Sequence, residues 1–220
     1  MIKGVIFDLD GTLLNSMPVW ENLGELYLKS LGIEAEPDLG RELFTMSMGQ
    51  AADYMIGHYG LKIDRERVME GIVREVQDFY AEKVPLKAGA RDFLEEFRER
   101  QLPMVIVTSG ERQLAEDALK RLGIYNWFDG IYTCTEFGTD KNHPDIYNAV
   151  SLMMDADPKD ILVFEDAYHA VKTAKDAGFV TAAVYDQSND RDLKKIWESA
   201  DYYLPEFKDF DVFWRRVSEK

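Results

Sequence analysis

The sequence has few of the residues that build the commonest protein zinc sites. It contains one cysteine, Cys134, and three histidines, His58, His143 and His169. A single cysteine excludes an internal disulfide and a cysteine-based zinc site. No two of the histidines have the spacing of a metal-ligand pair. A zinc site is therefore not expected.

Long apolar runs are also missing. No segment reaches the roughly 20 apolar residues that a membrane-spanning helix requires. Near the N-terminus, Asp8 and Asp10 lie where the apolar region of a signal peptide would have to be. We therefore expect a cytoplasmic protein with no membrane partner.

Basic residues are in deficit. The chain of 220 residues has 26 Lys and Arg against 41 Asp and Glu, which gives a net charge of -15. This charge disfavours a nucleic-acid partner, because a phosphate backbone requires a basic footprint. It is compatible with a small anionic substrate, because a metal ion and one lysine reverse the potential inside a single cleft.

The sequence does contain short apolar segments that alternate with helical patterns. The apolar runs are nearly continuous, which favours strands of a parallel sheet covered on both faces. We therefore predict the α/β class, with a doubly wound, mostly parallel sheet. The predicted strands are 2–7, 103–107, 161–164 and 179–184, and the helical patterns are 88–101, 111–122, 144–154 and 167–177.

Residues 16–85 interrupt this alternation and carry no convincing buried strand. Prolines mark both ends of the segment, at Pro18 and Pro85. We expect two domains: a core of residues 1–15 and 86–220, and a helical domain of residues 16–85 inserted after the first strand. Three amphipathic stripes predict its helices: Leu23, Leu26, Tyr27 and Leu31; Ala51, Tyr54, Met55 and Tyr59; and Val68, Ile72, Val76 and Phe79.

The first predicted strand ends in two acids, Asp8 and Asp10. Ligands bind at the carboxyl ends of strands in open α/β sheets, and two ionised carboxylates in one crevice repel each other. A divalent cation or a shared proton relieves that repulsion, and Mg²⁺ prefers oxygen ligands. Gly11 permits a sharp turn, and Thr12 is expected to hydrogen-bond the loop backbone. An isolated pair of this kind is more often a surface turn, so the other strand ends decide the interpretation.

Each predicted core strand ends in groups suited to phosphate or to a metal ion. A hydroxyl and small residues that open a helix form a good anion site, and a lysine and further acids complete the set. The groups are Thr108, Ser109 and Gly110 after 103–107, Lys141 after the next strand region, and Glu165 and Asp166 after 161–164.

Together these motifs resemble those of the haloacid dehalogenase superfamily. The matching stretches are DLDGT, VTSG, a lysine before PDIY, and VFEDAYHAVKTAKDAG. The insert resembles the small helical cap of the phosphatase and β-phosphoglucomutase-like branch. The resemblance covers essentially the whole chain and implies a Rossmann-like core carrying a cap domain.

The resemblance also implies an activity and a role for each residue. It implies a Mg²⁺-dependent phosphatase that hydrolyses small phosphate monoesters through an aspartyl-phosphate. Asp8 would be the nucleophile, and Asp10 the general acid and base. Phosphoryl binding is implied for Thr108, Ser109 and Gly110, and charge neutralisation for Lys141. The implied Mg²⁺ ligands are Asp8, the backbone carbonyl of Asp10, and Asp166. Glu165 would bind Mg²⁺ directly or through water.

A few positions depart from the family pattern. Ala167 and Ala170 stand where a serine and a glycine often follow the acidic pair, and Asn15 replaces a frequent aspartate at the hinge. The Lys-Pro-x-Pro pattern becomes Lys141-Asn142-His143-Pro144. None of these departures removes a group that is expected to contact the metal or the phosphate.

Two other functions stay open: a β-phosphoglucomutase-like phosphosugar mutase, and a non-catalytic binding module on the same fold. Residues 44–50 are expected to face the active site, and they offer Met46, Met48 and Gln50 where sugar-phosphate relatives often carry a basic residue. That lack favours a hydrolase over a mutase. Asp10 argues against a binding module, which has no chemical reason to keep it. No obvious interface helix argues against a monomer.

Overall fold

The computed structural model describes residues 1–43 and 46–219. Phe44 and Thr45, which belong to the segment expected to face the active site, therefore lie outside the described residues. The chain divides into two compact units, one of Met1–Asn15 with Pro85–Lys220 and one of Ser16–Val84. The first is an α/β unit and the second is helical.

The α/β unit is built on one six-stranded sheet with the order β3-β2-β1-β4-β5-β6. All the strand pairs are parallel, so the predicted fold class is confirmed. The chain moves outward in one direction from β1 to β3 and then returns to the other side of β1 with β4, which makes the boundary between β1 and β4 a topological switch point. The strands are β1 (Gly4–Phe7), β2 (Met104–Thr108), β3 (Gly130–Thr133), β4 (Ile161–Glu165), β5 (Val180–Val184) and β6 (Tyr202–Leu204).

The four predicted strands correspond to β1, β2, β4 and β5. Strands β3 and β6 lie at the two edges of the sheet; a strand region was expected before Lys141 without bounds, where β3 lies, and β6 was not predicted. Both are short, and both alternate buried with partly exposed residues instead of forming a continuous apolar run. An edge strand faces a neighbour on one side only, so it needs less apolar sequence than a central strand does.

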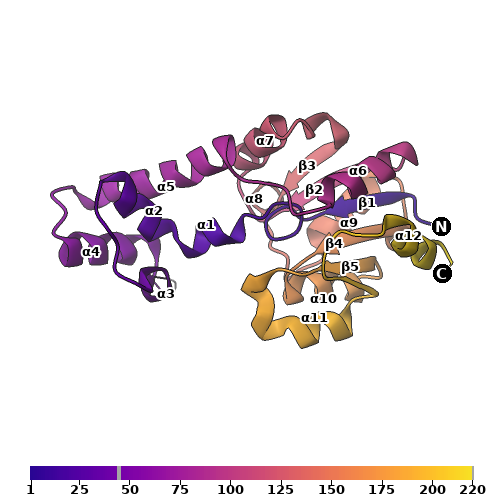
Figure 1. The fold of residues 1–220 in the computed structure, drawn as a ribbon. Helices are drawn as coiled ribbons and strands as arrows, with labels where there is room; N and C mark the ends of the chain where they lie inside the picture. The colour runs from indigo at the N-terminus through magenta and orange to yellow at the C-terminus, as the bar shows by residue number, and fades with distance from the viewer. Residues whose placement is uncertain (44–45, 220) are drawn as a thin grey trace. The chain divides into compact units, whose positions relative to one another are not determined.

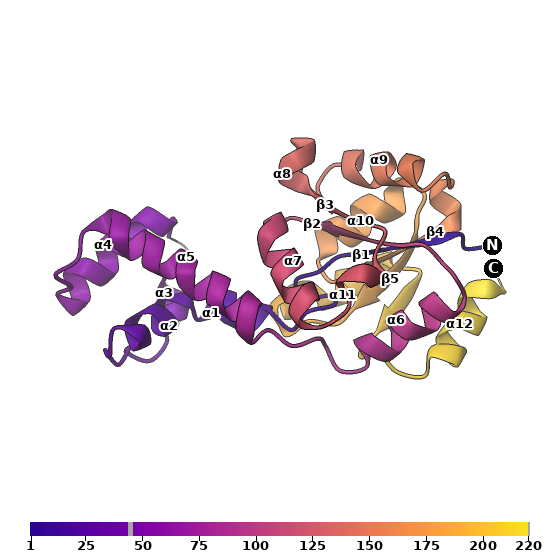
Figure 2. The same cartoon turned by 90° about the horizontal axis from the view of Figure 1, so that it is seen from above.

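Side chains of alternate residues in the central strands enter two different cores, as the two-residue period of a strand requires. Ile6 packs with residues of α9 and α10, among them Tyr147 and Val150. Phe7 faces the opposite way, where it stacks on Phe164 and meets Phe97 edge to face. Helix α9 therefore covers one face of the sheet, and α6 and α12 cover the other (Figure 2).

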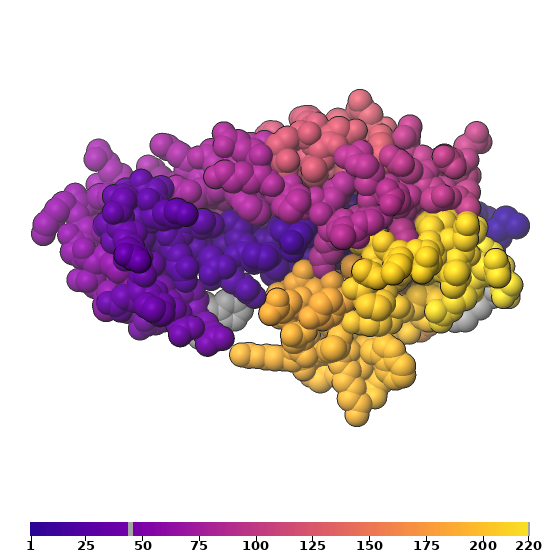
Figure 3. All heavy atoms as spheres, viewed as in Figure 1, coloured from indigo at the N-terminus to yellow at the C-terminus, as the bar shows by residue number. Residues whose placement is uncertain are grey.

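The helices between the strands have the bounds shown in Figure 1. Those of the α/β unit are α6 (Ala90–Glu99), α7 (Arg112–Arg121), α8 (Cys134–Phe137), α9 (Asp145–Met153), α10 (Tyr168–Asp176), α11 (Leu193–Ser199) and α12 (Phe210–Ser218), with 3-10 turns η1 (Tyr125–Trp127), η2 (Pro158–Asp160) and η3 (Gln187–Asp192). Helix α12 lies at the surface of this unit (Figure 3). Its Phe210 and Phe213 are buried, which is why the aromatic C-terminal stretch forms a closing helix.

The helical unit consists of α1 (Met17–Glu21), α2 (Leu23–Ser30), α3 (Leu39–Leu43), α4 (Met48–Tyr59) and α5 (Arg65–Glu82). The three predicted stripes lie on α2, α4 and α5, and residues of all three form a common core. In the last turns of α5 the buried residue is Tyr80 rather than Phe79, and Tyr80 accepts a hydrogen bond of 3.0 Å from Trp20 Nε1. Among the described residues, no helix combines the length and the apolar character needed to cross a bilayer.

We predict that Phe97→Ala lowers the free energy of unfolding of the α/β unit by about 3–5 kcal/mol, the usual cost of removing a fully buried phenyl ring. Phe97 is inaccessible to solvent and contacts rings from β1, β4 and α12. Urea unfolding followed by circular dichroism measures the change. Trp197→Ala removes a 64% exposed aromatic from α11 and is the control. An equal effect of both substitutions would contradict the packing described here.

Candidate active site at the carboxyl ends of β1 and β4

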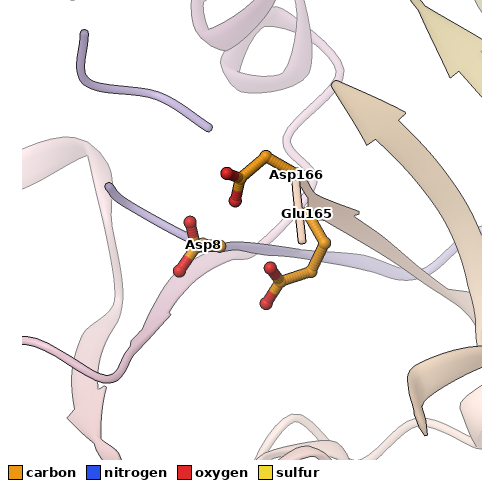
Figure 4. A group of neighbouring side chains, drawn as sticks. All are labelled: Asp8, Glu165 and Asp166. Atoms are coloured by element: carbon orange, nitrogen blue, oxygen red, sulfur yellow. The ribbon is translucent and has the colours of Figure 1, made fainter. Parts of the chain in front are cut away.

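Three carboxylates meet at the topological switch point. Asp8 directly follows β1, Glu165 is the last residue of β4, and Asp166 follows it. Figure 4 shows the three side chains turned toward one another. One oxygen of each lies within 4.8 Å of the others, and all three residues are buried. The register that pairs Phe7 with Phe164 puts the two strand ends side by side, and so brings these acids together.

Lys141 is the cation of this cluster. Its side chain is 4% exposed, and its Nζ donates to Oδ1 of Asp8 and, at 2.6 Å, to Oε1 of Glu165. Burial alone would lower the pKa of the ammonium, but the two carboxylates outweigh burial and raise it. Lys141 therefore carries its charge and offsets one of the three negative charges.

Glu165 has a second donor, the hydroxyl of Tyr147, at 2.7 Å from the same Oε1. Burial raises the pKa of Glu165 to about 7, repulsion from Asp8 adds to the rise, and Lys141 opposes it. Tyr147 is buried too, and burial together with the Glu165 charge raises the pKa of its hydroxyl well above the ordinary value. The tyrosine therefore stays protonated and serves as a donor to Glu165.

Asp166 is held by two neutral donors. Thr12 Oγ1 donates to Oδ1 at 3.2 Å, and Asn189 Nδ2 donates to Oδ2 at 2.7 Å. Burial, followed by repulsion from Asp8 and Glu165, raises the pKa of Asp166 well above its ordinary value. The prediction that Thr12 hydrogen-bonds the loop backbone is wrong, because its hydroxyl reaches this distant carboxylate instead.

The residues of this cluster fit a divalent cation. If all three carboxylates are ionised, the single ammonium of Lys141 leaves two negative charges uncompensated in a buried space. In the part of the chain that the structure describes, Asp8 Oδ2 is a buried oxygen without a hydrogen-bond partner. Such an atom is costly unless a proton or a cation satisfies it. A set of carboxylate oxygens is the donor set that hard divalent cations such as Mg²⁺ prefer.

Asp10 and the end of β2 lie close to each other. Thr108 Oγ1 accepts a hydrogen bond of 2.9 Å from Gly110 N–H. A Cβ at position 110 would lie 3.2 Å from Asp10 Oδ2 and 3.2 Å from Thr108 Oγ1, so glycine leaves the Asp10 carboxylate its space. Ser109 points elsewhere, with its Oγ 3.6 Å from Cys134 Sγ.

The predicted site residues thus fall into two neighbouring groups. Asp8, Lys141, Glu165 and Asp166 are joined by hydrogen bonds or by proximity, and Asp10 adjoins Thr108 and Gly110. Sequence reasoning missed Tyr147 and Asn189 as partners of the acids. Tyr147 lies six residues beyond Lys141 and ends the quoted PDIY motif, so the sequence offered a signal for it. Nothing in the sequence around Asn189 indicates its partner.

The helical unit brings a cation to the segment expected to face the active site. Within 44–50, Met46, Met48 and Gln50 stand where a basic residue is frequent, and a basic residue from another part of the unit lies beside them. A Cβ added at Gly49 would lie 1.9 Å from Nη2 of Arg65, so a guanidinium packs directly against the start of α4. Gln50 itself is engaged in a capping box with Ser47. Arg65 comes from the start of α5 and could not be assigned to this segment from the sequence.

Comparison with known proteins gives the following relatives. The sequence model of the family described as haloacid dehalogenase-like hydrolase matches residues 5–184. The phosphorylated carbohydrates phosphatase of Thermotoga maritima is 25% identical over 177 residues, which is 80% of this chain and 82% of that protein. The validoxylamine A 7'-phosphate phosphatase of Streptomyces hygroscopicus subsp. limoneus is 28% identical over 179 residues, which is 81% of this chain and 83% of that protein.

Among solved structures, a provisionally assigned β-phosphoglucomutase from Thermotoga maritima superposes with a TM-score of 0.84. The match covers 97% of this chain and 99% of that chain at 23% sequence identity. At this identity the likeness concerns the fold, including the combination of a parallel α/β unit with an inserted helical one.

We predict that a divalent cation stabilises the protein more at pH 8 than at pH 6. A divalent cation binds ionised carboxylates. Glu165, whose pKa is raised to about 7, is mostly protonated at pH 6 and mostly ionised at pH 8. Cation affinity should therefore fall about tenfold from pH 8 to pH 6 for this one competing proton. The measurement is the rise in Tm on adding MgCl₂, at constant ionic strength, in the two buffers.

Glu136→Gln is the matched control for that experiment. Glu136 is a partly exposed acid whose pKa is lowered to about 2 by its hydrogen bond with Arg112, so it does not titrate in this range. The variant should retain the wild-type difference between pH 8 and pH 6. A rise in Tm of wild-type protein that is equal at both pH values would contradict the role given to the buried acids.

Proposed function

The chain belongs to the haloacid dehalogenase-like hydrolase family, and on this premise we propose that it is a Mg²⁺-dependent phosphatase of small phosphate monoesters. The observation that carries the proposal is the buried acid cluster, whose Asp8 has one oxygen bound to Lys141 and the other without a partner among the described residues. A structural acid would have both oxygens satisfied. The names of the phosphatase relatives support phosphate esters as the substrate class.

Asp8 is the proposed nucleophile. An oxygen of its carboxylate attacks phosphorus, a new O–P bond forms, and the ester P–O bond breaks. The leaving alkoxide takes a proton from Asp10. In the second half, Asp10 accepts a proton from water, the water oxygen attacks phosphorus, and the Asp8–phosphorus bond breaks to release inorganic phosphate.

Asp10 is suited to this exchange of protons because of where it lies. Its Oδ2 lies beside Gly110 at the end of β2, next to the residues proposed to bind the phosphoryl group. The phosphoryl group would lie between the ends of β1 and β2, within reach of both acids.

Lys141 and the end of β2 supply positive potential for the transferring group. A buried ammonium that is already in place costs no reorganisation when negative charge develops on the phosphoryl oxygens. Thr108, Ser109 and Gly110 are the proposed phosphoryl-binding residues, with a hydroxyl and backbone N–H groups near the start of α7. Asp8, Asp166 and Glu165 would hold Mg²⁺, joined by the backbone carbonyl of Asp10, and the ion would supply further charge to offset that of the phosphate.

We assign substrate selection to the helical unit, as a cap inserted after β1. Arg65, which also pairs with Asp53 at 3.5 Å, brings a guanidinium next to Gly49, in a segment that has no basic residue of its own. That observation favours an anionic substrate and keeps the phosphosugar mutase as the second candidate, because a mutase has to bind a second phosphate. The two activities differ in their product, which is inorganic phosphate for a phosphatase and an isomeric sugar phosphate for a mutase.

We expect Mg²⁺-dependent phosphate release from a panel of sugar phosphates, sugar-alcohol phosphates and nucleotides. Asp8→Asn should lower kcat by about 10³-fold or more, since it removes the nucleophile. Asp10→Asn should lower kcat by about 10²–10⁴-fold, the usual contribution of a general acid and base. Asp157→Asn, at a 70% exposed carboxylate, is the matched control and should leave kcat unchanged.

The product decides between the candidates. Conversion of β-glucose 1-phosphate to glucose 6-phosphate without phosphate release would favour the mutase. Full activity of Asp10→Asn would contradict both enzymatic assignments. Absence of any turnover, with or without Mg²⁺, would leave the binding module as the explanation of the fold.

A further inference from the structure

The 3-10 turn η3 lies after β5 and has no part in the function proposed above. The side chain of Asn189 in this turn donates a hydrogen bond to Asp166 of the acid cluster. We infer that Asn189 is a positioning residue for Asp166, and that η3 is fixed for this task by the ion pair between Lys87 and Asp186. The inference rests on the proposed function only in taking Asp166 as a metal ligand.

The first observation is how the Asp166 carboxylate is held. Lys141 forms its hydrogen bonds with Asp8 and Glu165, so the donors seen on Asp166 are the neutral groups of Thr12 and Asn189. Each of them takes a different oxygen. A carboxylate with one donor on each oxygen has a fixed orientation, and the Asn189 contact, at 2.7 Å, is the shorter of the two.

The second observation is that η3 is itself fixed. Asp186 accepts hydrogen bonds from Ser188 N–H at 3.0 Å and Ser188 Oγ at 2.6 Å, and its backbone carbonyl accepts from Asn189 N–H at 3.1 Å. The other oxygen of Asp186 pairs with Lys87 Nζ at 2.9 Å, where the two side chains are 7% and 14% exposed. Lys87 also donates to the backbone carbonyl of Tyr185.

These contacts form a continuous set from Lys87 to Asp166. A buried ion pair is a stringent constraint, because removing one partner leaves an unpaired charge. It orients Asp186, which in turn sets the backbone of the turn that carries Asn189. Groups that hydrogen-bond to a metal-binding carboxylate commonly change metal affinity by about 10–100-fold when they are removed.

A purely structural role of Asn189 makes a different prediction. If the side chain only held η3 against the α/β unit, its loss would lower stability and leave the affinity for a cation unchanged. The two roles are therefore separated by measuring cation affinity and stability on the same variants.

The test is a Mn²⁺ titration followed by electron paramagnetic resonance, which reports free Mn²⁺ without any turnover. Asn189→Leu keeps the branched shape and removes the donor, and it should weaken Mn²⁺ binding about tenfold or more. Asn189→Ala should act in the same direction, and it serves if the leucine variant does not fold. Gln187→Ala changes an exposed residue of the same turn and should bind Mn²⁺ as the wild type does.

Lys87→Met tests the second half of the inference. It should also weaken Mn²⁺ binding, and adding it to Asn189→Leu should cause little further loss, because both substitutions release the same carboxylate. Independent, additive losses would overturn the role given to Lys87.

The outcomes separate this inference from the proposed function. If the wild-type protein binds Mn²⁺ and both Asn189→Leu and Asn189→Ala bind it with the same affinity, the inference is overturned and the phosphatase proposal remains intact. No Mn²⁺ binding by the wild-type protein would overturn both.

Discussion

The repulsion among three buried carboxylates is the constraint on which the rest of the site depends. Asp8, Glu165 and Asp166 would not be stable as ionised neighbours without compensation, and Lys141 offsets only part of their charge. Burial raises the pKa of Glu165 and of Asp166, which favours their protonated forms and so reduces the remaining negative charge. The cluster is thus ready to exchange protons for a cation, which a surface group of acids with ordinary pKa values would not be.

The parallel sheet creates this constraint. Strands β1 and β4 are neighbours in the sheet although the helical unit, β2, β3 and the helices α6 to α9 lie between them in the chain. Their carboxyl ends therefore meet at the point where the winding of the sheet reverses, and backbone and side-chain donors from several loops converge there. Apolar side chains pack on both faces of the sheet, and the pairing of β1 with β4 keeps the two strand ends next to each other.

Much of this could be predicted from the sequence, because the central strands are continuous apolar runs and the polar residues come directly after them. Asp8, Lys141 and Asp166 were expected in one place for that reason. What could not be predicted depends on contacts between distant segments. The hydroxyl of Thr12 has local partners that the sequence suggests, yet it binds Asp166. Asn189 reaches the same carboxylate only because Asp186 shapes its turn, and Arg65 meets Gly49 only through the packing of α4 and α5.

The central claim is that the cluster at the ends of β1 and β4 binds a divalent cation. Anomalous diffraction from crystals soaked in MnCl₂ tests it most directly, because manganese scatters anomalously and prefers oxygen ligands as Mg²⁺ does. The account predicts an anomalous peak in contact with carboxylate oxygens of Asp8 and Asp166. A fully occupied peak elsewhere in the molecule, or no peak beside these acids at saturating manganese, would contradict it.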